Sequence, residues 1–71
     1  MNIVCSRKLL RTKWTATTPF HDETHFLVQH VCLDHQGLAR GVVIQGLNNR
    51  HQFELTMAQL EDSDRWQLGW K

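Results

Sequence analysis

The sequence predicts a mainly β fold: a small bent antiparallel sheet or an SH3-like partial barrel of four to five strands, with one short C-terminal helix. Several segments are rich in β-branched and aromatic residues, which favour strands. Short polar or glycine-containing segments separate them, and such short connections join antiparallel neighbours. A helix-capping pattern occurs close to the C-terminus, so we expect a short helix there.

The first strand is expected over residues 9–18 (LLRTKWTATT), which are rich in threonine around a central Trp14. Pro19 is expected to end this strand, because proline lacks the backbone N–H that a ladder needs. The segment 20–26 (FHDETHF) is interpreted as a loop leading into the next strand.

The strongest strand signal covers residues 25–34 (HFLVQHVCLD). Its alternating positions are apolar on both faces, with Phe26, Val28 and Cys32 on one and Leu27, Val31 and Leu33 on the other. A strand that is apolar on both faces is typical of a sheet that is bent or covered on both sides. Residues 34–37 (DHQG) are expected to form a turn in which Gly37 adopts a positive φ.

A further strand is expected over residues 39–47, where Gly41 and Gly46 indicate bulges or sharp bends. Asn48 and Asn49 are expected to form a two-residue turn, because asparagine tolerates the left-handed conformation. Residues 50–56 (RHQFELT) return as a strand with His51, Phe53 and Leu55 on one face.

Thr56 begins a different pattern. With Gln59 three residues later it matches a capping box, and Met57, Ala58 and Leu60 favour one or two helical turns. The last segment, 63–70 (SDRWQLGW), fits either another capped turn or a short closing strand.

Length and charge limit the possible functions. Seventy-one residues form one domain, expected as a flexible lead-in over residues 1–8 and a single tryptophan-rich β domain over 9–71. The net charge of +1 is not typical of a dedicated nucleic-acid binder. The N-terminal part of the chain carries four basic residues, Arg7, Lys8, Arg11 and Lys13. They could contact phosphate, although the favoured interpretation is a solvated, frayed segment.

The expected location is the cytoplasm. Residues 1–14 lack a secretory apolar region, and no stretch approaches the roughly 20 apolar residues of a membrane span. Cys5 and Cys32 could form at most one bridge, and both thiols are expected to be reduced.

Three tryptophans dominate the apolar material of this small chain. Burying all of them would contribute about 11–19 kcal/mol before ordering costs, which exceeds the expected net stability of about 4–10 kcal/mol. We therefore expect at least two to be buried. Trp14 is expected in the core, and Trp70, the penultimate residue, is the best candidate for exposure.

No catalytic constellation is evident in the sequence. The carboxylates at 22–23 and at 61, 62 and 64 are expected to be solvated, and no cofactor or metal is expected. A metal-dependent or thiol-dependent site at His30, Cys32 and His35 is kept as an alternative, although a structural zinc site needs a fourth ligand.

Specific residues carry a resemblance that covers residues 9–71. They are Trp14 within KWT, Pro19, Phe26 and the closing W-x-x-G-W-K formed by Trp66, Gly69, Trp70 and Lys71. With these features the chain resembles small tryptophan-rich bacterial proteins grouped as a domain family of unknown function. The resemblance implies that the tryptophans define the domain and that the setting is the bacterial cytoplasm. It implies no activity, substrate or cofactor.

These observations predict a small non-enzymatic binding module that engages a protein or nucleic acid through an aromatic and basic face. The expected contact residues are Trp70, Trp66, Arg11, Lys13 and Arg65. We expect no membrane association and a monomer or weak homo-oligomer. A structural subunit whose tryptophan face packs in an oligomer is a further alternative.

Overall fold

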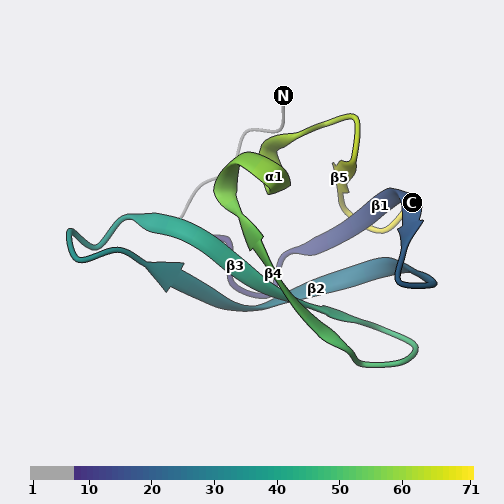
Figure 1. The fold of residues 1–71 in the computed structure, drawn as a ribbon. Coiled ribbons are helices and arrows are strands. Elements are labelled where there is room, and N and C mark those ends of the chain that lie inside the picture. Colours follow the sequence, from purple (N-terminus) through teal and green to yellow (C-terminus); the bar gives the residue numbers. More distant parts are fainter. Residues whose placement is uncertain (1–7) are drawn as a thin grey trace.

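The computed structural model describes residues 8–71, which form an open five-stranded antiparallel sheet and one short helix (Figure 1). The mainly β prediction is therefore confirmed. The elements are β1 (Lys13–Phe20), β2 (Glu23–Leu33), β3 (Ala39–Gly46), β4 (Gln52–Thr56), α1 (Met57–Glu61) and β5 (Trp66–Leu68). Their order in the sheet is β4-β3-β2-β1-β5, so the helix and the turn after it connect the two edge strands.

The first strand differs from its predicted bounds at both ends. Arg11 adopts a φ of 66° and the Thr12 amide donates to the Leu9 carbonyl, so this part is a turn and β1 starts only at Lys13. Pro19 does not end the strand. Register with β2 jumps from Thr15↔His25 to Phe20↔Glu23, which leaves β1 with extra residues. Proline is tolerated there because an irregular segment needs no ladder N–H.

The predicted loop over residues 20–26 is wrong, because β2 begins at Glu23. Only His21 and Asp22 connect β1 to β2, and both have positive φ, 51° and 64°. Positive φ at both central residues is the feature of a type I′ hairpin turn, whose twist matches that of the strands it joins. The sequence signal was missed because the usual glycine is lacking.

A bulge changes the predicted faces of β2. Val28 pairs with Ile44 but His30 pairs with Val43, so Gln29 is an extra residue in β2. Beyond the bulge the alternation is shifted by one, and Val31 rather than Cys32 packs against the core with Phe26 and Val28. The core consists of the buried apolar residues Leu9, Trp14, Ala16, Phe26, Val28, Val42, Ile44, Leu55, Leu60 and Trp66.

The β3–β4 connection is longer than predicted. It spans residues 47–51 and is closed by a hydrogen bond from the Gly46 amide to the His51 carbonyl, and its left-handed residue is Arg50 at φ 60°. Asn48 and Asn49 instead direct their backbone amides at the carboxylate of Glu23. The predicted two-residue turn is therefore wrong.

Glu23 was expected to be solvated but is only 1% exposed. Its Oε1 accepts from the amides of Asn48 at 2.7 Å and Asn49 at 3.1 Å, and its Oε2 accepts from Asn48 Nδ2 at 2.8 Å. Gly46 makes room for this side chain, since a Cβ there would lie 2.5 Å from Glu23 Oε1. The buried carboxylate thus holds the β3–β4 loop against the start of β2.

Other local predictions are confirmed. Gly37 has a φ of 80° in the turn between β2 and β3, and the capping box of α1 is present, with the Thr56 hydroxyl accepting from the Gln59 amide. Phe53 packs against the core and Leu55 belongs to it. The C-terminal segment, left open by the sequence, contains the closing strand β5. The expected lead-in, apart from Lys8, lies outside the described residues, as does Cys5.

Candidate functional site

The C-terminal segment clasps the edge of the sheet. β5 pairs with β1 through Trp14↔Leu68 and Ala16↔Trp66. The chain then turns at Gly69, whose φ of 88° disfavours other residues.

Three hydrogen bonds to Lys13 and Thr15 hold the turned segment over β1. The Gly69 amide donates to the Lys13 carbonyl at 2.7 Å, and Thr15 Oγ1 donates to the Gly69 carbonyl at 2.7 Å. The Lys71 amide donates to the same Thr15 hydroxyl at 2.9 Å. Thr15 is consequently only 8% exposed, although its side chain is on the face of β1 opposite the core. We call this face the outer face.

Trp70 lies on the outer face. Its Nε1 donates to the Phe26 carbonyl at 3.0 Å, and Lys13 Nζ lies 4.7 Å from the centroid of its ring. The ring contacts His25 edge-on at 6.5 Å, and His25 Nε2 lies 3.0 Å from the backbone oxygen of Lys71. Trp70 is still 42% exposed, as expected, so it is both a structural clasp and surface.

Trp66, the first residue of β5, lies on the core face of the sheet. It is 4% exposed, and its ring contacts Phe26 at 5.4 Å and Phe20 at 5.8 Å in edge-on geometry. The two terminal tryptophans therefore enclose β1 between them, one in the core and one on the outer face. This arrangement explains the spacing of Trp66, Gly69 and Trp70, because the turn at Gly69 brings Trp70 to the face opposite Trp66.

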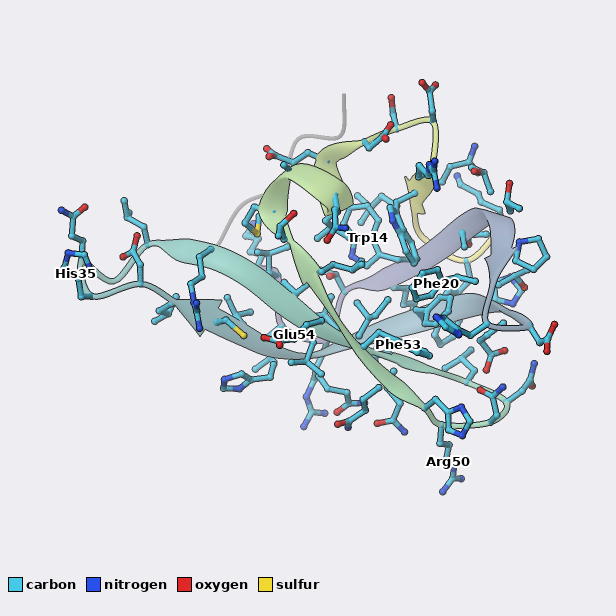
Figure 2. All side chains as sticks on the ribbon, in the orientation of Figure 1. Trp14, Phe20, His35, Arg50, Phe53 and Glu54 are labelled. Atoms are coloured by element: carbon cyan, nitrogen blue, oxygen red, sulfur yellow. The ribbon has the colours of Figure 1, made fainter. Side chains whose placement is uncertain are left out.

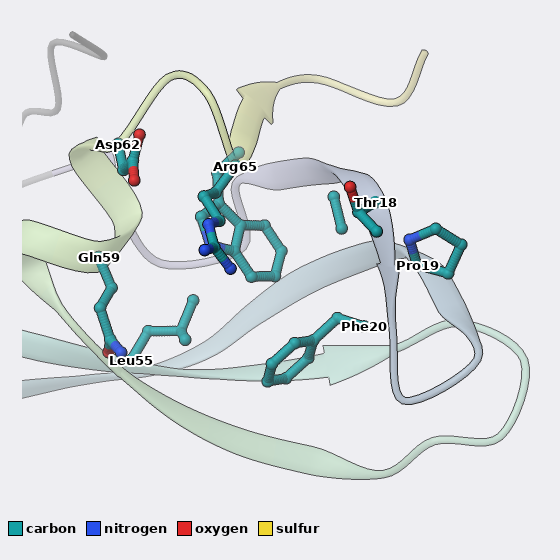
Figure 3. Close-up of a pocket in the computed structure, with 9 residues that line it drawn as sticks. Thr18, Pro19, Phe20, Leu55, Gln59, Asp62 and Arg65 are labelled. Carbon is teal, nitrogen blue, oxygen red and sulfur yellow. The ribbon is translucent and has the colours of Figure 1, made fainter.

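A cleft of about 410 Å³ opens on the core side, between α1, the turn before β5 and the irregular segment of β1 (Figure 3). Its apolar lining includes Phe20, Leu55 and Trp66, and its polar lining includes Gln59 and Arg65. Ala16, Thr18, Pro19 and Asp62 complete it. The extra residues of β1 form one wall, so the cleft exists because β1 departs from β2 there. Bulges of this kind often lie beside binding sites.

The backbone around Arg65 is firmly held. Its amide donates to the Asp62 carbonyl at 3.1 Å, and its carbonyl accepts from the Thr17 amide at 2.9 Å. In Figure 3 the guanidinium group projects into the cleft. Among residues 8–71 the structure shows no hydrogen bond or ion pair from this guanidinium. Arg65 is an exposed residue at the cleft, so its guanidinium group is accessible from solvent.

Asp62 and Gln59 are partly engaged within their own turns. Asp62 Oδ1 accepts from the Asp64 amide at 3.0 Å, and Gln59 Oε1 accepts from the Thr56 amide at 2.8 Å. In the capping box, the side-chain oxygen of Gln59 is therefore already bonded to the Thr56 amide. Its Nε2 group remains as a donor at the cleft.

The five contact residues expected from the sequence do not form one continuous face. Trp66 and Arg65 line the cleft, whereas Trp70 and Lys13 lie together on the outer face. Arg11 is exposed in the turn before β1. Sequence reasoning missed Phe20, Gln59 and Asp62 as lining residues, and only Pro19 hinted at the irregular wall.

The alternative site at His30, Cys32 and His35 does not assemble. In the part of the chain that the structure describes, no group of three or more His, Cys, Asp or Glu could hold a metal ion. Figure 2 shows His35 at the tip of the β2–β3 hairpin. The nearest polar contact of the Cys32 thiol is Glu54 Oε1, at 3.9 Å.

These features define a small β domain in which Trp66 and Trp70 lie on opposite faces of the sheet beside β1. Residues 12–71 match the family described as Tryptophan-rich protein (DUF2389), and the chain belongs to this family of unknown function. The resemblance identified from the sequence is thereby confirmed. No curated protein and no solved structure was found to match the chain. Among residues 8–71, no helix has the length and apolar character needed to cross a membrane.

Proposed function

We propose that this protein is a non-enzymatic binding module that engages another protein through the cleft beside Arg65. The observation that carries the proposal is the Arg65 guanidinium, which has no acidic partner among residues 8–71 and lies at a cleft with an apolar lining of Phe20, Leu55 and Trp66. Concave sites that bind ligands combine such an apolar surface with a few fixed polar groups. Arginine beside aromatic rings is also enriched at protein interfaces.

A protein partner fits this cleft better than a nucleic acid. A phosphate backbone is usually recognised by several cations, and among residues 8–71 the cleft is lined by one arginine together with the carboxylate of Asp62. Base stacking needs an accessible ring face, but Trp66 is 4% exposed. The overall charge of +1 agrees with this preference. The bacterial cytoplasm is the proposed setting, supported by the family resemblance.

The outer face around Trp70 and Lys13 is assigned a structural role first. Trp70 donates its indole N–H to the Phe26 carbonyl, and one side of its ring faces the Lys13 ammonium group. A ring so engaged contributes to holding the C-terminal segment in place. Its exposed part remains available as a secondary contact.

Site-specific photo-crosslinking in cells that naturally produce the protein tests the proposal. A photoreactive phenylalanine derivative is placed at Thr18, on the cleft wall, and at Gln29, an exposed bulge residue used as the control position. We expect protein adducts from Thr18 that decrease at least fivefold with Arg65→Gln, and no such dependence from Gln29. Adducts that nuclease removes, or that are equal at both positions, would contradict the proposal. Melting temperatures that rise with protein concentration would instead support the oligomer alternative.

A further inference from the structure

We infer, on the basis of the proposed function, that the cleft binds an extended segment of a partner protein in which an apolar residue and an Asp or Glu lie two positions apart, in either order. The structure provides an apolar subsite, an anion anchor, an amide donor and a stretch of strand without a paired neighbour.

The apolar subsite is formed by Phe20 and Leu55 with the edge of Trp66. Phe20 also contacts Phe53 at 5.0 Å, so its ring is fixed by packing and not free to fill the cleft. The volume of about 410 Å³ lies at the lower end of the range of about 300–1,000 Å³ typical of ligand sites. It suits one large side chain of a peptide better than a bulky cofactor.

The anion anchor is Arg65. Its planar guanidinium matches a carboxylate through two parallel hydrogen bonds, which are stronger than bonds between neutral groups. Asp62 does not already occupy this role, because it forms no ion pair with Arg65 and its Oδ1 accepts from the Asp64 amide. The carboxylate of Asp62 also lines the cleft and partly offsets the charge of Arg65, so the anchor is the directed pair of hydrogen bonds from the guanidinium and not a net positive cleft.

The third contact comes from Gln59. Its Oε1 is held by the Thr56 amide, which leaves Nε2 to donate to an acceptor in the cleft. A backbone carbonyl of the peptide is such an acceptor. Arg65 and Gln59 together present donors, and an acidic peptide presents acceptors, so the two sets are complementary.

The wall formed by Thr18 and Pro19 favours an extended ligand. Neither residue has a partner in the register with β2 or with β5. Both are exposed at the cleft. An extended segment lying along this wall would direct alternate side chains to one side, about 7 Å apart. That periodicity is the reason for the spacing of two between the apolar residue and the acid.

Selection from a library of random nine-residue segments tests the inference. The segments are displayed internally, so that no free carboxyl terminus is offered. Parallel selections use the wild-type protein, Arg65→Gln and the matched control Arg40→Gln, since Arg40 is an exposed arginine of β3 outside the cleft. We expect the wild type and the control to enrich an apolar residue and an acid two positions apart, in either order, and Arg65→Gln to lose the preference for the acid.

A synthetic peptide from the selection completes the test. Changing its acid to the amide should weaken binding to the wild type at least tenfold and leave binding to Arg65→Gln unchanged within twofold. Enriched segments that lack the acid, or an acid preference that persists in Arg65→Gln, overturn the inference while the proposed function stands. If no segment is enriched over a blank surface, the inference is overturned. The photo-crosslinking at Thr18 then decides the proposed function separately.

Discussion

Replacing Glu23 by glutamine removes a buried negative charge while preserving the shape of the side chain. The carboxylate is 1% exposed and accepts three hydrogen bonds from Asn48 and Asn49. Glutamine can keep one carbonyl oxygen in place for the two backbone amides. Its amide group must then face the Asn48 side chain, which has to rotate to present its oxygen.

The size of the effect follows from these three bonds. A hydrogen bond to a charged group contributes about 1.5–3 kcal/mol and a neutral one about 0.5–1.5 kcal/mol, so neutralising three removes about 3 kcal/mol. Asn48 and Asn49 are exposed, and water replaces part of what they lose. We therefore expect Glu23→Gln to lower the free energy of unfolding by about 2 kcal/mol. For a domain of this size the melting temperature should fall by about 8–16 °C.

Thermal unfolding followed by circular dichroism measures the change, with urea unfolding as an independent check of the free energy. The matched control is Glu54→Gln, because Glu54 is exposed on β4 and makes only a long contact with the Cys32 thiol. The control should change stability by less than about 0.5 kcal/mol. Equal losses for the two variants would show that the buried carboxylate does not hold the β3–β4 loop as described.

Three further changes test other contacts. Gly46→Ala places a Cβ 2.5 Å from Glu23 Oε1 and should cost about 1–3 kcal/mol in urea unfolding, whereas an unchanged midpoint would mean that the carboxylate moves freely. Trp70→Phe removes the N–H that donates to the Phe26 carbonyl, so hydrogen exchange of the β5 amides should become faster and the free energy of unfolding should fall by about 1 kcal/mol. Unchanged exchange rates would show that Trp70 does not hold the C-terminal segment in place. Thr56→Ala removes the helix cap and should lower the free energy of unfolding by about 1 kcal/mol, and a neutral result would contradict the capping geometry.

The parts of the fold that depend on neighbouring residues were predictable. The capping box needs only Thr56 and Gln59, and the glycine at position 37 supplies the positive φ that its turn requires. The burial of Trp14 followed from the size of the ring compared with the small apolar content of the chain. In each case the determining interaction lies within a few residues or in the overall composition.

The candidate site was only partly predictable. Arg65 and Trp66 were identified from their residue types, but the cleft that unites them also needs Phe20 from β1 and Leu55 from β4. These segments meet through α1 and the turn before β5, and no pattern in the sequence states that they do. The separation of Trp70 from Trp66 onto two faces likewise depends on β5 pairing with β1.

The sequence by itself determined that this chain is a small β domain with a capped helix, because strand propensity and helix capping depend on residues close together in the chain. It also determined that the indole rings stabilise the fold, because that conclusion depends only on the total apolar content. Only the tertiary structure decided that Gln29 bulges, that Glu23 is buried beneath the β3–β4 loop, and that the Arg65 guanidinium stands over an apolar cleft. The physical reason is that strand pairing joins residues far apart in the chain. Whether a carboxylate or guanidinium finds a partner is settled only when those strands come together.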